Sequence, residues 1–253
     1  MPPLISTLAR WTSQRRETLG LAAALLVAVA GAVVLARQAA QAPLQASVAV
    51  PAPSEQVVLL DGTSKQAAQA TATFAGGCFW GVQAVFQHTH GVLNAVSGYA
   101  GGSAASATYA QVSGGRTGHA ETVQITYDPR QISYAQLLHI FFSVAHDPTQ
   151  VNRQGPDNGT EYRSVVFFET EAQRRTAQAY MAQIDTAQVF SRPIATQLAA
   201  LGAFHPAEAH HQNYAARNPE APYIVAFDAP KISALKKVFP VLFRPQPVLA
   251  MNH

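Results

Sequence analysis

Apolar and polar positions along the chain follow two different periods, which alternate between residues 70 and 243. Strand-like patterns, either alternating or as a short buried run, occur at residues 70–74, 122–127 and 162–168. Helix-like spacing begins at Cys78, Ser133 and Thr170, with weaker segments at 207–217 and 233–238. Strands mixed with helices in this order predict an α+β fold, a two-layer sandwich of a mixed β-sheet packed with helices, with a long irregular C-terminal coil.

Two of the predicted helices carry a start signal. Ser133 with Gln136, and Thr170 with Gln173, have the spacing of a capping box, in which the first side chain accepts a hydrogen bond from the third helical residue. The stretches 97–118 and 146–160 show no strong periodicity. Loops of that length in a compact domain usually carry function, so we expect the functional residues there and at the strand ends.

The N-terminal part of the chain has a different character. Residues 18–36 are apolar or small almost throughout, and the unbroken run at 19–36 would span about 27 Å as a helix, close to the thickness of a membrane core. A basic leader, residues 1–17, precedes this segment. Residues 37–69 are rich in Ala, Gln and Pro and predict a flexible linker. The catalytic domain is then expected at 70–243, with a tail at 244–253.

The leader predicts the orientation of a membrane segment. Its arginines place the N-terminus in the cytoplasm by the positive-inside rule and the folded domain across the membrane. We expect an inner-membrane anchor with the catalytic domain in the periplasm. A small-x-small site at 40–42 leaves cleavage and export open as an alternative.

Composition excludes several classes of protein. Charged residues make up only 12% of the chain, and two of its three net positive charges lie in the leader. The remainder is nearly neutral, which gives no electrostatic footprint for nucleic acid. A single cysteine excludes an internal disulfide and a multi-cysteine zinc site. No cysteine and no acidic pair completes a metal-ligand set with His205, His210 and His211, so we expect no bound metal.

The candidate chemistry is centred on Gly77, Cys78, Phe79 and Trp80. A cysteine directly after a strand and a glycine turn lies at the first turn of the next helix, where backbone N–H groups favour the nucleophilic thiolate. A small buried side chain is the alternative role for a lone cysteine. The two adjacent aromatic residues favour an apolar methyl group over a metal as the neighbour of the sulfur.

These residues are the first of an ordered series of motifs. The others are Ser97-Gly98-Tyr99-Ala100-Gly101-Gly102, Thr108-Tyr109, Thr117-Gly118-His119-Ala120-Glu121, His146-Asp147-Pro148-Thr149, Asn152-Arg153-Gln154-Gly155-Pro156-Asp157, Gly159-Thr160-Glu161-Tyr162-Arg163-Ser164, His211-Gln212, Asn218-Pro219 and Pro222-Tyr223. Together they resemble the A-type peptide methionine sulfoxide reductases, over nearly the whole of the predicted domain.

The resemblance implies a reaction and a set of catalytic residues. The Cys78 thiolate would attack the sulfur of methionine S-sulfoxide and become a sulfenic acid, with Glu121 as the proton donor. Tyr109 and Tyr162 match the tyrosines that hydrogen-bond the sulfoxide oxygen, and Asp157 matches a supporting aspartate. Phe79 and Trp80 match the residues that line the pocket for the methyl group of the substrate, and Gly77 is a further expected substrate-binding residue. The substrates implied are free methionine sulfoxide and oxidised proteins.

One position departs from the family pattern. Many members carry a second cysteine after the tyrosine that matches Tyr223, whereas Ile224 follows it here. No cofactor is expected to be bound, and the sulfenic acid would have to be reduced by an external thiol, either a thioredoxin-like protein or a low-molecular-weight thiol. Two other functions stay open: a membrane-tethered binder of oxidised methionine with little turnover, and a thiol peroxidase.

Overall fold

The computed structural model describes residues 50–62 and 67–251. The predicted leader at 1–17, the apolar segment at 18–36 and residues 37–49 and 63–66 of the predicted linker lie outside these residues. Within them, no helix combines the length and the apolar character that a membrane crossing requires.

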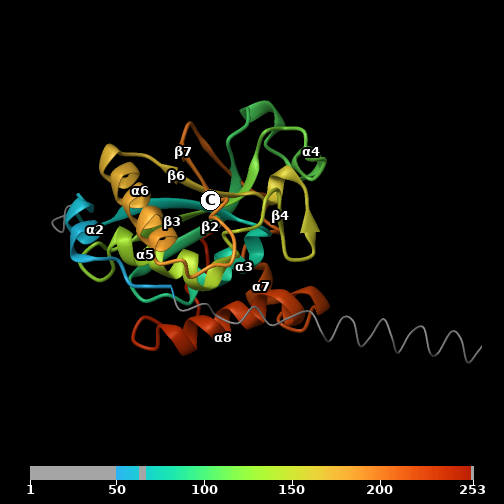
Figure 1. Cartoon of the computed structure of the whole chain (residues 1–253). Coiled ribbons are helices and arrows are strands. Elements are labelled where there is room, and N and C mark those ends of the chain that lie inside the picture. Colours follow the sequence, from blue (N-terminus) through green and yellow to red (C-terminus); the bar gives the residue numbers. More distant parts are fainter. Residues whose placement is uncertain (1–49, 63–66, 252–253) are drawn as a thin grey trace, which may run out of the picture. The chain divides into compact units, whose positions relative to one another are not determined.

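The described chain is built on a six-stranded mixed sheet (Figure 1). Its strands in spatial order are β7 (Gln197–Ala200), β6 (Ser164–Phe168), β1 (Ala70–Gly76), β3 (Ala120–Tyr127), β2 (Val92–Ala100) and β8 (Phe204–Pro206). Neighbouring strands are antiparallel except β6 and β7, which are parallel. β4 (Arg153–Gln154) and β5 (Asp157–Asn158) form a separate two-stranded ladder. The predicted α+β class with a mixed sheet is confirmed.

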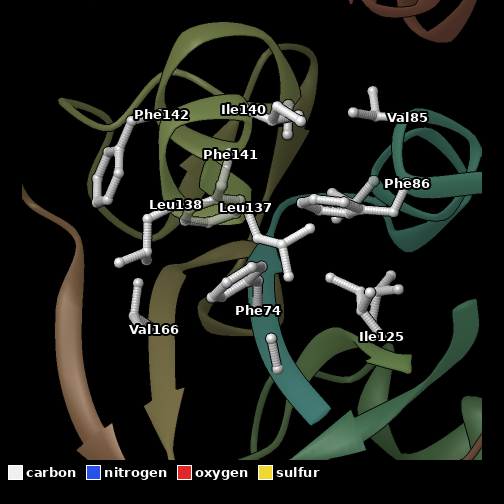
Figure 2. Close-up of a cluster of buried hydrophobic side chains, with 14 of the residues drawn as sticks. Phe74, Val85, Phe86, Ile125, Leu137, Leu138, Ile140, Phe141, Phe142 and Val166 are labelled. Carbon is white, nitrogen blue, oxygen red and sulfur yellow. The ribbon is translucent and has the colours of Figure 1, made fainter. Parts of the chain in front are cut away.

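Helices pack against this sheet and enclose the core. They are α3 (Phe79–Gln87), α5 (Tyr134–Ile140), the π-helical turn η2 (Phe141–Ala145) and α6 (Glu171–Thr186). Figure 2 shows Phe74 of β1 surrounded by side chains from α3, α5 and η2. Phe74 stacks on Phe141 with ring centroids 4.8 Å apart, and both rings are excluded from solvent. Full burial of such side chains contributes about 1.5–3 kcal/mol each.

The two predicted helix starts are confirmed. Ser133 caps α5 with a complete capping box, since Ser133 Oγ accepts from the Gln136 N–H and the Gln136 side chain accepts from the Ser133 N–H. Thr170 caps α6 by accepting from the Gln173 N–H. Both interactions are made within four residues of chain, which is why the sequence alone reveals them.

One part of the predicted linker, residues 50–62, is folded. Ser54 caps a short helix, α2 (Glu55–Leu60), whose Val57 is 3% exposed. The Tyr180 hydroxyl of α6 donates to the carbonyl oxygen of Pro51 at 2.8 Å. Six helical residues are too few to show a periodicity, and the helix depends on contact with α6, so composition alone suggested a flexible chain.

Two further segments differ from the prediction. The stretch 97–118 begins as the end of β2, whose alternation is broken by a register shift between Val92 and Asn94. The rest of that stretch contains η1 (Ala104–Ser106) and α4 (Tyr109–Val112). The C-terminal region is more helical than an irregular coil, and its helices are α7 (Tyr214–Arg217), η4 (Ile224–Asp228) and α8 (Ala229–Val238).

Candidate active site

Cys78 lies where β1 turns into α3. Gly77 before it has φ +86°, and a Cβ there would lie 2.4 Å from the Gln154 side chain, so this turn requires glycine. Cys78 is the N-terminal cap residue of α3 and is 9% exposed. The turn therefore places its thiol at the start of the helix, at the edge of the buried core.

Glu121 reaches the same helix start from the neighbouring strand. It lies opposite Tyr99 near the beginning of β3 and is 3% exposed. The Phe79 N–H donates to Glu121 Oε2 at 3.0 Å, which leaves Oε1 to carry a proton. Burial raises the pKa of Glu121 to about 8, despite the lowering effect of that hydrogen bond. The carboxyl group is therefore protonated at neutral pH and can act as an acid.

The thiol of Cys78 is not the ready thiolate that its sequence position suggested. Burial raises its pKa well above the usual value, and the charge of Glu121, once that carboxyl is ionised, and the charge of Asp228 raise it further. The backbone N–H of Trp80 and the ammonium of Lys231 lower it. The helix start does favour the thiolate, as expected, but loss of hydration has the larger effect.

Both predicted tyrosines belong to this group. Tyr109 starts α4 and is 38% exposed, whereas Tyr162 ends η3 (Thr160–Tyr162) and is half-buried. Burial, together with the charges of Glu121 and Cys78, raises the pKa of each phenol. The two hydroxyl groups thus stay protonated and can donate hydrogen bonds close to the thiol and the acid.

Asp157 is connected to the site through a residue that sequence reasoning did not assign. The Tyr223 hydroxyl donates to Asp157 Oδ2, which ties the β5 loop to the C-terminal region. Burial raises the pKa of Asp157, while the Tyr223 hydrogen bond and Lys231 lower it. The structure therefore brings all five predicted catalytic residues together.

The two aromatic residues after Cys78 have different surroundings. Phe79 is 1% exposed and packs into the main core, with Tyr99 at 5.8 Å and His211 at 5.3 Å between ring centroids. Trp80 is only half-buried, stacks on Tyr214 at 3.8 Å and meets Tyr223 edge-on at 5.9 Å. Trp80 with the two C-terminal tyrosines thus forms an aromatic wall, whereas Phe79 belongs to the core.

Residues around position 210 hold the site together. Glu208 accepts hydrogen bonds from the Tyr99 hydroxyl and from the Tyr109 N–H, each at 2.9 Å. His211 is buried against Tyr109, with 4.5 Å between ring centroids. The sequence pattern predicts only a weak helix at 207–217 and does not reveal these roles, because each is a contact with a residue about 100 positions away. The described residues contain no cluster of three or more metal-ligating side chains.

Comparison with known proteins shows the family to which the chain belongs. The family profile described as "Peptide methionine sulfoxide reductase" matches residues 70–240. The chain belongs to this family. The reductase assignment is confirmed with it: the protein is an oxidoreductase that acts on methionine sulfoxide.

Relatives of this reductase match between 60% and 72% of the chain. The peptide methionine sulfoxide reductase MsrA 2 of Mesorhizobium japonicum is 54% identical over 182 residues, which are 72% of this chain and 93% of the relative. The reduced form of Mxr1 from Saccharomyces cerevisiae matches with a TM-score of 0.57 at 32% identity, over 60% of this chain and 87% of that one. Methionine sulfoxide reductase A of Corynebacterium diphtheriae matches with a TM-score of 0.52 at 32% identity, over 68% and 84%.

Proposed function

We propose that Cys78 is the nucleophile and Glu121 the acid in the reduction of methionine S-sulfoxide. The observation that carries this assignment is the pairing at the start of α3, where a buried, protonated carboxyl accepts a hydrogen bond from the amide next to the cysteine. A sulfoxide oxygen is a poor leaving group until it is protonated, so a nucleophile and an acid are needed in the same place.

The proton and oxygen balance of the reaction follows from these two groups. Glu121 gives its proton to the sulfoxide oxygen while Cys78 Sγ attacks the sulfur, and the thiol proton returns to Glu121. The hydroxyl then moves from the substrate sulfur to Cys78 Sγ, so that the sulfur–oxygen bond of the substrate and the newly formed sulfur–sulfur bond both break and Cys78 is left as a sulfenic acid. The substrate sulfur is reduced to the thioether of methionine and Cys78 is oxidised by the same two electrons.

The surrounding residues would orient the sulfoxide. The hydroxyls of Tyr109 and Tyr162 are neutral donors available to its oxygen. Trp80, stacked on Tyr214, offers an apolar surface to the methyl group. Asp157 supports the site through Tyr223 rather than by direct proton transfer. Gly77 and Phe79 contribute by shaping the turn and its packing.

We propose that an external thiol regenerates the enzyme. Cys78 is the one cysteine within these 253 residues. The position after Tyr223 is Ile224, which is 2% exposed and packs against Ala84 and Ala215. A thioredoxin-like protein or a low-molecular-weight thiol would condense with the sulfenic acid, release water and form a mixed disulfide. A second thiol would then restore Cys78 and leave as the disulfide of the reductant.

We also propose a location for the reaction. The apolar segment at 18–36 behind a basic leader favours an inner-membrane anchor with the catalytic domain in the periplasm, or export if the leader is cleaved. Clients there would be oxidised proteins or free methionine sulfoxide. Fractionation of cells that express the full chain, combined with protease accessibility of the folded domain, tests this proposal. A domain that stays with the cytosol and is protected in spheroplasts would contradict it.

A single-turnover assay tests the chemistry. The full-length chain in mild detergent is mixed with racemic N-acetyl-methionine sulfoxide and no reductant. We expect about one methionine per chain, drawn from the S epimer, and one oxygen added to the protein mass. The Cys78→Ser variant should form none. A wild-type chain that binds the sulfoxide but forms no methionine would leave a binding protein, and faster oxidation by peroxide than by sulfoxide would favour a peroxidase.

A further inference from the structure

An ion pair lies against the first turn of α3. Asp228 ends η4 and Lys231 follows it by three residues in α8, with Lys231 Nζ 3.3 Å from Asp228 Oδ1. The Asp228 side chain is fully buried and that of Lys231 is 18% exposed. The pair therefore differs from the ordinary helical ion pair, which lies in solvent and contributes little.

Gly81 locates this pair relative to the nucleophile. A Cβ on Gly81 would lie 2.1 Å from Asp228 Oδ1 and 2.6 Å from Lys231 Nζ, so the pair fills the space that a side chain at position 81 would need. Gly81 follows Cys78 by three residues, and helix positions three apart lie on the same side. Both charges are thus packed beside the turn that carries the thiol.

Stability does not account for the arrangement. Asp228 Oδ2 is buried and has no hydrogen-bond partner. Burial of a carboxylate that has one oxygen without a hydrogen-bond partner lowers stability. The attraction within an ion pair whose hydrogen bonds are incomplete seldom offsets the loss of hydration. Buried charge beside a nucleophile is instead characteristic of sites where protonation is controlled.

We propose that the ion pair beside Gly81 controls the protonation of Cys78, with Lys231 favouring the thiolate form and Asp228 opposing it. The proposal deepens the function proposed above, since it rests on Cys78 as the nucleophile. Lys231 supplies part of the charge stabilisation that water would give to an exposed thiolate. It acts through Cys78 and needs no contact with substrate.

The electrostatic surroundings of Cys78 support this role. Titratable groups that act on the thiol or are acted on by it come from β3, α4, η3, the C-terminal region and α8, and they are Glu121, Tyr109, Tyr162, Tyr223, Asp228 and Lys231. Lys231 is the cation among them, and it lowers the pKa of Cys78, which burial, Glu121 and Asp228 raise. Its charge also lowers the pKa of Asp157 across the site.

The single cysteine makes a direct test possible. Iodoacetamide reacts with the thiolate, so the rate of mass increase of the intact chain against pH gives the titration midpoint of Cys78 alone. The midpoint is measured for the wild type and for Lys231→Met, Lys231→Arg and Asp228→Asn. Lys237→Met is the matched control, because Lys237 lies exposed on the same helix.

The expected shifts have opposite signs. Lys231→Met should raise the midpoint by about one pH unit, which slows labelling at neutral pH about tenfold, whereas Lys231→Arg should stay near the wild type. Asp228→Asn should lower the midpoint, because a negative charge beside the thiol is lost. Lys237→Met should change nothing.

Unchanged midpoints in Lys231→Met and Asp228→Asn, with native circular dichroism, would overturn the proposal and leave a structural pair. If Lys231→Met does not fold, Asp228→Asn decides alone, and an unshifted midpoint there overturns the proposal. Alkylation needs no sulfoxide reduction, so failure of this inference is distinct from failure of the single-turnover assay.

Discussion

The residues at the two ends of α3 are buried to nearly the same extent, but burial has a different consequence at each end. Toward the C-terminal end, Val85 and Phe86 are fully excluded from solvent and contact apolar side chains (Figure 2). At the N-terminal end, Cys78 and Glu121 are 9% and 3% exposed, and both are titratable. Exclusion of water stabilises the fold at one end, and at the other it raises two pKa values.

This contrast shows that the site depends on its water-excluded surroundings to set the protonation of its residues. A protonated glutamic acid at neutral pH requires a position with little water, and the sheet and α3 provide it. The same burial disfavours the nucleophilic form of Cys78, so hydrogen bonds and charges at the helix start must compensate. We therefore expect substitutions at the two ends to separate activity from stability.

The largest effect is expected for Glu121→Gln. Glutamine keeps the size and the acceptor for the Phe79 N–H but cannot deliver a proton to the sulfoxide, so turnover should fall about 10²- to 10⁴-fold. Steady-state assays with a dithiol reductant measure it. Glu169→Gln is the matched control, since Glu169 accepts a hydrogen bond from Thr71 at the far end of β1. A loss below about threefold in Glu121→Gln would show that another group is the acid.

Phe86→Ala should affect the other end of the helix. Removing a fully buried ring that lies 5.7 Å from Phe74 should lower the free energy of unfolding by about 3–5 kcal/mol. Urea unfolding measures this change. The rate per folded molecule, and the alkylation midpoint of Cys78, should stay at the wild-type values. A shifted midpoint would show that the two ends of α3 are coupled.

The pH dependence of the free energy of unfolding should reveal the buried carboxyl of Glu121 at the N-terminal end of α3. The pKa of Glu121 is raised to about 8 in the folded chain, so the folded state binds more protons than the unfolded state between about pH 4.5 and about pH 8. The Glu121 contribution to stability is complete below this window and is lost as the pH rises through it. Its slope approaches about 1.4 kcal/mol per pH unit. Urea unfolding at several pH values should show this slope in the wild type and a weaker one in Glu121→Gln.

Features made by neighbouring residues could be predicted from the sequence. The capped helix starts and the strands β1, β3 and β6 were found because period and capping spacing are local. β2 was missed, since its register shift at Val92 interrupts the alternation. The folded residues 50–62 were missed because Val57 is buried only by contact with the rest of the domain.

The site was predicted mainly through the resemblance to a family. Nothing near Glu121 in the sequence reveals an acid, because its protonation depends on burial and on the amide of Phe79, 42 positions away. Asp228 and Lys231 lie still farther from Cys78 in the chain, and only the packing of η4 and α8 against α3 brings them beside Gly81.

Ser133→Ala should produce the smallest effect, and it tests whether the cap of α5 contributes to stability independently of the core. Ser133 Oγ accepts from the Gln136 N–H at 3.1 Å at the start of α5, and the substitution leaves this N–H without its partner. The free energy of unfolding should fall by about 1 kcal/mol, with turnover and the Cys78 midpoint unchanged. Ser133→Asp, which restores an acceptor and adds a negative charge at a helix start, should recover the loss. A drop as large as that of Phe86→Ala would mean that loss of the cap of α5 also disturbs the packing of the aromatic core. The contribution of the cap to stability would then not be local.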